Sequence, residues 1–320
     1  MDYLSKCYGF TIEGGVLLCH NIHSGSSEDL VILPEGIRVV AERAMAGFEC
    51  RKLVMPASLV EIEKEGFKFA EIKEIDFGSC KLERMGYEAF RGCKAKTVLP
   101  DSLKIIDAWA ATDLVISEGK RVRLPSDLSF ICSHSINLEN VREIEIDERA
   151  VKESTNFLGA IRSGLPNKLG RWVTVRVFRG DTVVNEFIIT DFYEGWGCNF
   201  IKQDGIDYRR YDDNFDQLQD ESCKFQMAVY RVSWPYDLPP ERKAFYDSYA
   251  CKEILKKKIG KGKIVLAECL GMLEKRILPQ HLAEILVAAS QKKNLEMSDC
   301  LLDLIRRNHG IAAKSLDLEL

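Results

Sequence analysis

A repeat of 22 residues constrains this chain more than any other feature. Pro34, Pro56, Gly78 and Pro100 stand at a constant spacing of 22 residues, and each follows a short apolar segment. Proline and glycine both interrupt a strand at such a position. A unit of this length cannot bury its own apolar face, so neighbouring units must stack to form a continuous core. The first half of the chain is therefore predicted to be a solenoid.

The spacing of the units changes towards the end of the array. A fifth unit breaks at Pro125, three residues late, and a sixth segment, EIEI at 143–146, has lost its proline. The segments before the five breaks read LVIL, KLVM, EIDF, KTVL and RVRL. After each break the chain is expected to return through a second short strand and a helical turn. We expect a kink or loop before Pro125, where the register would place Lys96 beside Arg121.

Alternation along each strand assigns side chains to an inner and an outer face. Two inner rows are predicted: Leu33, Met55, Phe77, Leu99 and Leu124, and Val31, Leu53, Ile75, Thr97 and Val122. The outer face is predicted to be the partner-binding surface, and its residues are Lys52, Val54, Glu74, Asp76, Lys96, Val98, Arg121 and Arg123.

The outer face has two interpretations. Lys52, Glu74 and Lys96 alternate in sign, and opposite charges on stacked strands support pairing by roughly 0.2–1 kcal/mol each. Arg121 with Glu143, and Arg123 with Glu145, would continue this pattern. The face therefore either recognises a partner or is a solvated charge ladder that fixes the register of the strands.

The repeats resemble a known family. FTIEGGVLL followed by VILPEGIRVVAERAMAGFEC is similar to the opening of a BspA-like leucine-rich repeat domain, and MPASLVEIEKEGF, YEAFRGC and LPDSLKIIDAWA continue the likeness over residues 8–147. The resemblance implies a leucine-rich repeat β-solenoid over residues 1–147. For exported relatives it also implies an adhesin-like surface role. The chain departs from the family pattern at Gly78, before Pro125 and at Met45, which stands in place of an aromatic residue.

Residues 148–164 are predicted to be a capping helix and a linker, because apolar residues recur there with helical spacing. Residues 165–235 are predicted to begin with a β-hairpin, RWVTVRVFRGDTVVNEFIIT, whose turn is Gly180-Asp181. The remainder of that region is rich in aromatic and acidic residues. Its aromatic residues form either a small core or a recognition patch, and Asp212, Asp213, Asp216 and Asp220 are expected to be a solvated acidic face.

Residues 236–320 are predicted to be an α-helical hairpin domain, whose first helix opens at Pro240. The stretches RVSWPYDLPPERKAFYDSY and GMLEKRILPQHLAEILVAAS resemble the degenerate ankyrin-like helical tail behind leucine-rich repeats in some uncharacterised bacterial proteins. The predicted fold class is therefore α+β, with a leucine-rich repeat β-solenoid, a small hairpin region and a C-terminal helical bundle.

Composition limits the environment and the partners. A net charge of −4 gives no reason to expect nucleic acid or an anionic membrane as a partner. No apolar run reaches the roughly 18 residues that span a bilayer. The eleven cysteines are scattered singly without a CxxC pair, and the start of the sequence lacks the pattern of a secretory signal. Free thiols in a reducing cytosol, and hence a cytoplasmic location, are expected.

No motif predicts a catalytic, cofactor or metal site. The sequence contains no GxSxG, HExxH or GxxxxGK[ST], and Cys19, His20 and His23 are too few for a zinc site. The leading hypothesis is a non-enzymatic protein–protein interaction module that uses the strand face and a helical surface, as a monomer or homodimer, with a partner of unknown identity. The alternatives are a ligand-binding or enzymatic module in residues 165–235 and an adhesin-like surface protein.

Overall fold

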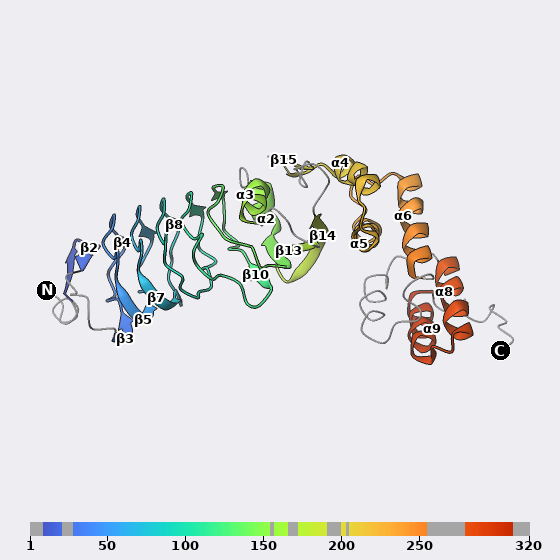
Figure 1. The fold of residues 1–320 in the computed structure, drawn as a ribbon, viewed down its shortest axis with the longest axis horizontal. Coiled ribbons are helices and arrows are strands. Elements are labelled where there is room, and N and C mark those ends of the chain that lie inside the picture. Colours follow the sequence, from blue (N-terminus) through green and yellow to red (C-terminus); the bar gives the residue numbers. More distant parts are fainter. Residues whose placement is uncertain are drawn as a thin grey trace. The chain divides into compact units, whose positions relative to one another are not determined.

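The fold is described from a computed structural model of the 320-residue chain. The description covers residues 9–20, 28–153, 157–165, 172–190, 200–202, 205–254 and 279–309. The chain divides into two compact units, an N-terminal unit of residues 1–207 and a helical unit of residues 208–320. Each unit is described by itself below (Figure 1).

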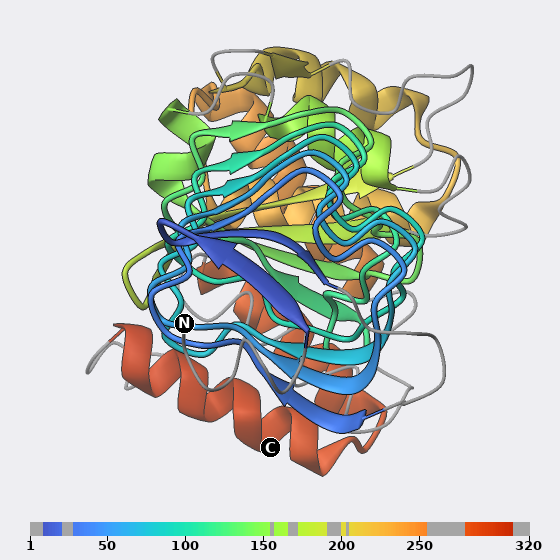
Figure 2. The ribbon, with the colours of Figure 1, turned by 90° about the vertical axis from the view of Figure 1, so that its left-hand side faces the viewer.

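The N-terminal unit is a solenoid of stacked turns with one continuous sheet on one side (Figures 1 and 2). An antiparallel pair opens this sheet, and short parallel strands then follow at one strand per turn. These are the second short strands that the sequence predicts after each break. The order is β1 (Phe10–Glu13), β2 (Val16–His20), β4 (Val39–Val40), β6 (Glu61–Ile62), β8 (Arg84–Met85), β9 (Ile105–Ile106) and β11 (Phe130–Ile131).

The other side of the solenoid is divided into two sheets. The first sheet is parallel and contains β3 (Glu28–Ile32), β5 (Glu49–Val54) and β7 (Glu71–Asp76). The second sheet contains β10 (Arg121–Arg123), β12 (Glu143–Asp147), β13 (Trp172–Arg179) and β14 (Thr182–Thr190). Lys52 lies opposite Glu74, and Arg121 lies opposite Glu143, as the 22-residue phase predicts.

The core lies between the two sides of the solenoid, and both predicted inner rows are buried in it. Every residue of the row that begins with Leu33 is at most 6% exposed. The same holds for the row that begins with Val31, which includes the polar Thr97. Between these rows and the return strands, the rings of Phe67 and Phe90 stack with their centroids 5.0 Å apart. The repeat therefore fixes the core, because equivalent residues of successive turns bury one another.

Each turn also ends in the same tight bend, at which one residue has a positive φ. Arg43, Glu65 and Glu88 have φ angles of 58°, 57° and 55°, and Trp109 and His134 follow at 60° and 59°. The N–H of Glu65 donates to the Tyr87 carbonyl of the next turn at 2.9 Å. The strained backbone is therefore compensated by hydrogen bonds between turns.

The strand stack is interrupted before Pro125, as expected, but the register there differs from the prediction. Lys96 forms an isolated bridge with Val115, not with Arg121. Leu114 and Ile116, which flank Val115, are buried, so this segment takes the next place in the stack. The residues that follow form a tight loop closed by an antiparallel bridge between Glu118 and Arg121.

The end of the solenoid is covered by helices and by the predicted hairpin. The single helix predicted over 148–163 is instead two helices, α2 (Glu148–Glu153) and α3 (Phe157–Gly164). The Leu138 N–H of the last turn donates to the Gly164 carbonyl of α3 at 2.8 Å. The hairpin β13–β14 has its turn at Gly180, as predicted, and β13 pairs in parallel with β12.

This pairing differs from the predicted boundaries. Residues 165–235 do not form one region, because the hairpin extends the solenoid sheet while the residues from 208 onwards belong to the helical unit. The apolar residues of β13 are buried against the core that β12 already covers, which accounts for the continuation. A short pair, β15 (Ile201–Lys202) with β16 (Gly205–Ile206), follows the hairpin.

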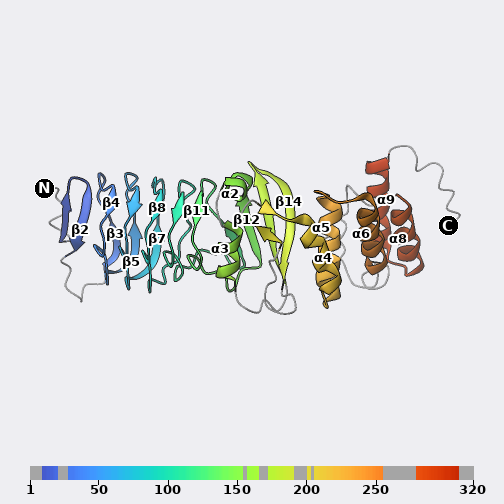
Figure 3. The same cartoon turned by 90° about the horizontal axis from the view of Figure 1, so that it is seen from above.

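The helical unit consists of short helices, as predicted (Figure 3). They are α4 (Tyr208–Asp213), the 3₁₀ helix η1 (Asn214–Gln217), α5 (Glu221–Ser233), α6 (Pro240–Glu253), α8 (Pro279–Gln291) and α9 (Leu295–His309). Asp220 caps α5 by accepting from the Ser222 and Cys223 N–H groups, and Pro240 opens α6. The stretch KIVLAECLGMLEKR at 263–276, whose apolar spacing predicts a further helix, lies outside the described residues. The ankyrin-like resemblance stays a prediction.

The acidic row predicted in this unit is only partly solvated. Asp213, Asp216 and Asp220 are exposed, but Asp212 is 6% exposed and forms a bidentate ion pair with Arg231 at 2.7 and 2.9 Å. The Tyr246 hydroxyl donates to the same carboxylate at 2.9 Å. The expectation for Asp212 was wrong because the short helix α4 turns this one carboxylate towards α5 and α6.

The aromatic residues of the same region do not form one core. Phe200 packs edge-on against Phe187 in the N-terminal unit, with the ring centroids 6.3 Å apart. Tyr211 and Phe215 are buried in the helical unit, where Phe215 meets the ring of Tyr246. Tyr208, also predicted to belong to this core, is half-buried and stacks on Tyr236 with the ring centroids 5.6 Å apart. Two further aromatic residues predicted to join the core, Phe192 and Trp196, lie outside the described residues.

Candidate functional site

The outer face of the three-stranded sheet, and of the segments that continue it through the bridges at Lys96 and Val115, carries exposed apolar side chains. Leu30 is 47% exposed, Ile32 50%, Val98 63% and Val115 46%. The strand alternation that buries Leu33 and Val31 turns these neighbouring residues outwards. Apolar residues in adjacent rows of one face are the composition expected of an interaction surface.

The charged residues of this face form one small cluster. Lys52 Nζ lies 2.7 Å from Glu74 Oε1 and 3.4 Å from Asp76 Oδ2. Its hydrogen bond to Glu74 raises the pKa of Lys52, so the ammonium form is retained. Lys96 continues the column beside Glu74, but it belongs to none of the ion pairs among the described residues. Of the three charges predicted to alternate, Lys52 and Glu74 therefore form an ion pair, and Lys96 has no described partner.

The outer face of the second sheet is different, because most of its charges compensate one another. Arg123 lies opposite Glu145 as predicted, but Glu145 pairs with Arg121 and Arg123 is in none of the described ion pairs. Arg121 lies 3.2 Å from Glu143 and 3.4 Å from Glu145, and Arg176 lies 2.8 Å from Glu186. Arg176 also bonds Glu143. This row across β10, β12, β13 and β14 has the form of the register-fixing ladder described above. Arg121 is therefore committed to the sheet itself.

A groove of about 490 Å³ opens where the two sheets separate. Four of the predicted partner-binding residues meet in it: Glu74, Asp76, Lys96 and Val98. Lys52 and Val54 lie one strand away on β5, and Arg121 and Arg123 lie on the second sheet. The groove is completed by Ile75, Phe77, Gly78, Thr97, Leu99, Pro100, Asp101, Ser117 and Glu118.

The main chain is not fully paired along this groove. At the preceding turn, the Met55 N–H donates to the Asp76 carbonyl at 2.9 Å. The equivalent bond from Phe77 to Val98 is absent from the described hydrogen bonds, and the Val98 carbonyl accepts from the Thr97 hydroxyl at 3.4 Å instead. The ladder is therefore open at the groove.

Sequence reasoning missed Val115, Asp101, Ser117 and Glu118. Aligning the fifth unit on Pro125 placed Arg121 next to Lys96 and left the preceding residues without a position. The alternation Leu114, Val115, Ile116, followed by the turn residue Gly119, was the available signal for an additional strand position.

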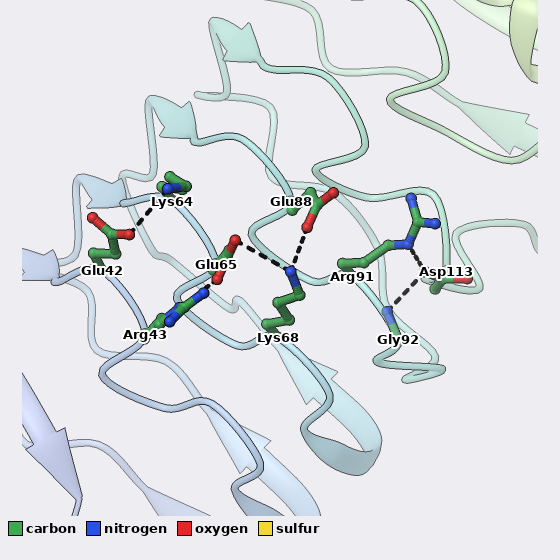
Figure 4. A network of polar contacts seen from close by, with 9 residues as sticks. All are labelled: Glu42, Arg43, Lys64, Glu65, Lys68, Glu88, Arg91, Gly92 and Asp113. Carbon is green, nitrogen blue, oxygen red and sulfur yellow. Dashed lines mark hydrogen bonds and ion pairs between the residues drawn. The ribbon is translucent and has the colours of Figure 1, made fainter.

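The bends at one edge of the solenoid hold a second, denser charge network (Figure 4). Lys68 Nζ lies 2.6 Å from Glu88 and 3.2 Å from the buried Glu65, which also bonds Arg43. The bond to Arg43 lowers the pKa of Glu65, and the bond to Lys68 lowers the pKa of Glu88. Because each carboxylate has a partner one turn away, this network ties successive turns together.

Aromatic residues accompany that network. Phe69 is 63% exposed at a φ of 57°, and Lys68 Nζ lies 5.6 Å from the centre of its ring. Trp109 is enclosed on both faces, with the Arg91 guanidinium at 4.7 Å and the His134 ring at 5.0 Å. The ring of Trp109 is therefore already in contact with side chains of the neighbouring turns, whereas the ring of Phe69 is accessible to solvent.

The helical unit contains a pocket of about 680 Å³ lined by residues of α4, α6 and the loop before α6. Its basic residues are Arg209 and Arg242, and its acidic residues include Asp213 and Glu241. The Arg242 guanidinium lies 5.0 Å from the ring centre of Phe245 and donates to the Asp212 carbonyl at 2.8 Å. The pocket is thus an open cleft with a fixed cation in its wall.

Neither a metal centre nor a membrane span is found in the part of the chain that the structure describes. No group of His, Cys, Asp and Glu there is placed to hold a metal ion, and no described helix is long and apolar enough to cross a membrane. Eight cysteines lie in the described ranges, all as free thiols, and five of them are buried. Burial raises the pKa of the Cys80 thiol to about 11.

Comparison with protein families identifies the repeat. Residues 20–114 match the BspA type leucine rich repeat region in six copies. This part of the chain is therefore a leucine-rich repeat region of the BspA type, as its motifs implied. The match ends one residue before Val115, where the strand stack begins to open. A search of curated protein sequences returns no match.

Two solved structures are similar to parts of the chain. A leucine rich cell surface protein from Faecalibacterium prausnitzii A2-165 shares 16% identity, with a TM-score of 0.30, over 51% of this chain and 35% of that protein. The pneumococcal vaccine antigen PcpA shares 18% identity, with a TM-score of 0.35, over 57% of this chain and 51% of that protein. The chain thus spans about a third and about half of their lengths, and likenesses of this degree carry no functional argument.

Proposed function

We propose that this chain is a non-enzymatic protein–protein interaction module whose strand face, on the three-stranded sheet and its groove, receives a protein partner. The observation that carries the proposal is the contrast between the two sheets. On the outer face of the second sheet, Arg121 and Arg176 are held in ion pairs, although Arg123 is in none of the described ones. The first sheet exposes Leu30 and Ile32, and the segments that continue it expose Val98 and Val115 beside Lys96, which also has no described ion pair.

An exchange of two charges separates recognition from mere register fixing. In the double variant Lys52→Glu/Glu74→Lys the pair at 2.7 Å is retained with its direction reversed, but position 52 then faces Asp76 and position 74 faces Lys96 with like charge, each at a cost of roughly 0.2–1 kcal/mol. If the face recognises a partner, the exchange weakens capture of that partner while the melting temperature falls only slightly. A charge ladder without a partner shows the same small fall in melting temperature and no change in capture.

The assay is affinity capture from native lysate of the source cells with the full chain as bait, quantified by mass spectrometry. The matched control is Glu42→Lys/Lys64→Glu, which exchanges another exposed pair, 3.2 Å apart, at the edge of the solenoid. We expect proteins that the wild type and this control retain and that the strand-face exchange loses. Identical sets of captured proteins for all three baits would show that the strand face is not the partner-binding surface.

We further propose a reducing, cytoplasmic location, supported by the free and mostly buried cysteines of the described residues. The alternative is an adhesin-like surface role, which the resemblance of the repeats to the BspA type suggests for exported relatives. Treatment of intact source cells with a membrane-impermeant biotinylation reagent separates the two. Protection until the cells are lysed is expected for a cytoplasmic protein, and labelling of intact cells would favour the surface role.

A second candidate function is the binding of a small zwitterionic ligand in the pocket of the helical unit. Arg209 and Arg242 line the pocket together with Asp213, Asp237 and Glu241, and Arg242 is fixed by its bond to the Asp212 carbonyl. A thermal-shift screen of amino acids and other small zwitterions tests this candidate, with Arg209→Ala as the variant that should abolish any shift. Equal shifts for the wild type and Arg209→Ala would exclude this pocket as the site.

A further inference from the structure

The groove on the strand face lies between three segments of the chain, around Ile75–Gly78, Lys96–Asp101 and Ser117–Glu118. Up to Lys96 the strands are bonded normally, since the Ile75 N–H donates to the Lys96 carbonyl at 3.0 Å and the Lys96 N–H donates to the Lys73 carbonyl at 2.9 Å. On the other side, the Thr97 N–H donates to the Val115 carbonyl at 3.0 Å. Past these bonds the three segments separate, and the groove occupies the space between them.

The separation leaves backbone donors without partners in the described structure. The N–H groups of Phe77, Val98 and Leu99 make none of the described hydrogen bonds, although the side chains of Phe77 and Leu99 are buried. Backbone donors beside a core are normally paired, with protein, water or a ligand. A row of such donors along a sheet interruption is the feature that an added strand uses.

We propose that this groove takes an extended segment of a partner protein, one that alternates apolar residues with lysine or arginine and pairs with the open ladder as an added strand. The inference rests on the proposed function and specifies its partner. The volume of about 490 Å³ lies within the range of ligand clefts, about 300–1,000 Å³. Val98 lines the groove, and its side chain is exposed to solvent, so the groove is accessible from outside.

Charge complementarity selects a basic segment. Four carboxylates line the groove, and Lys96 is the single basic residue among them. Lys52 neutralises Glu74 and Asp76 from the neighbouring strand, but Asp101 and Glu118 belong to none of the described ion pairs. A lysine or arginine between them gains attraction, whereas an acidic segment is repelled.

The apolar part of the preference follows from the strand geometry. Val98 and Val115 are exposed on the outer face, beside the position that an added strand would take. Side chains of an added strand alternate between the two faces of the sheet, so apolar residues at every second position lie beside these valines. The basic residues between them are those expected to reach Asp101 and Glu118, the carboxylates without a described ion pair. An alternating apolar and basic heptapeptide satisfies both requirements.

The test is selection of a phage-displayed library of random heptapeptides on the full chain, followed by fluorescence anisotropy with the enriched peptides. We expect enrichment of alternating apolar and basic sequences. Their affinity should fall about tenfold for Asp101→Lys/Glu118→Lys and about threefold for the milder Asp101→Asn/Glu118→Gln, since each exposed charge contact is weak. The matched control Glu13→Lys/Glu71→Lys makes the same charge change away from the groove and should keep the affinity.

A second measurement tests the main-chain pairing without altering the protein. Methylation of alternate backbone nitrogens of an enriched peptide removes the donors of one edge, and its methyl groups hold that edge away from the groove N–H groups, so methylation of the paired edge should weaken binding at least tenfold. The proposal is overturned if no basic heptapeptide is enriched, if groove and control variants bind equally, or if methylation of neither edge weakens binding.

The single variant Lys52→Glu separates failure of this inference from failure of the proposed function. Lys52 lies on the strand face but does not line the groove. If Lys52→Glu reduces capture of a native partner while the groove variants do not, the strand face is the interaction surface and the groove proposal falls. If neither change affects capture, both proposals fall.

Discussion

The contact between Phe69 and Gly92 allows the stacking of successive turns to be measured. The ring of Phe69 in one turn lies directly over Gly92 in the next. A Cβ added at Gly92 would lie 2.4 Å from Cδ1 and 3.0 Å from Cε1 of that ring, and Gly92 has a φ of 79°. The substitution Gly92→Ala therefore introduces two separable costs, backbone strain at position 92 and a steric clash with Phe69.

The two costs have different magnitudes and different remedies. A non-glycine residue with a left-handed backbone costs roughly 1–2 kcal/mol, which remains whatever occupies position 69. Overpacking against the ring adds about 1–2 kcal/mol, at the lower end of the usual range because the exposed ring can shift. Gly92→Ala should thus destabilise the wild type by about 2–4 kcal/mol, but the Phe69→Ala variant by only about 1–2 kcal/mol. Phe69→Ala is the matched background because it removes the ring and keeps a Cβ at position 69.

Urea denaturation of the four proteins of this cycle gives the coupling free energy, provided that the m-value stays constant. We expect the double variant to be about 1–2 kcal/mol more stable than the sum of the single effects predicts. Equal costs of Gly92→Ala in the two backgrounds would refute the stacking of these turns at 22-residue spacing.

Three further outcomes follow from the contacts of single residues. Asp212→Ala should lower the unfolding free energy by about 3–5 kcal/mol, because it leaves the buried Arg231 unpaired, and a urea titration measures this loss. Because the folded-state pKa of Glu65 is lowered, its contribution to stability is complete above the ordinary glutamate pKa and is lost as the pH falls through the lowered value; Glu65→Gln should therefore flatten the acid limb of a plot of melting temperature against pH. Iodoacetamide at pH 8, with peptide mapping, should modify the exposed Cys300 well before the buried Cys80, whose pKa is about 11, and equal rates would contradict the described burial.

Periodicity in the sequence was sufficient to predict the core of the solenoid. Pro34 and Pro56 set the phase, and alternation then assigned Leu33 and Met55 to the interior and Lys52 to the outer face, as the structure shows. This works because a solenoid repeats the same local environment in every turn, so a single register error would be visible in several units at once.

The groove could not be predicted in the same way. The sequence indicated an interruption before Pro125 but assigned the wrong neighbour to Lys96, because Val115 enters the stack without a proline after it. The interruption before Pro125 occurs only once in the array, so no equivalent unit is available to confirm which residues pair there. The unpaired donors near Phe77 and Val98 depend on how far the segments separate, which the pattern of apolar residues does not specify.

Contacts between segments distant in the sequence were the other gap. The hairpin turn at Gly180 was predicted from local signals, but the parallel pairing of β13 with β12 depends on which sheet edge is available. Asp212 resembled its exposed neighbours in the sequence, and only the approach of Arg231 from α5 distinguishes it. Such contacts leave no periodic trace in a single sequence.

The most direct test of the strand face as the interaction surface is site-specific photo-crosslinking. A benzophenone amino acid replaces Val98 in the groove or, as the matched control, Phe130 on the opposite seven-stranded sheet, where the native side chain is 37% exposed. After irradiation in native lysate, we predict a discrete cross-linked partner from position 98 that is absent from position 130. A partner that cross-links from position 130 and not from position 98 would contradict the account.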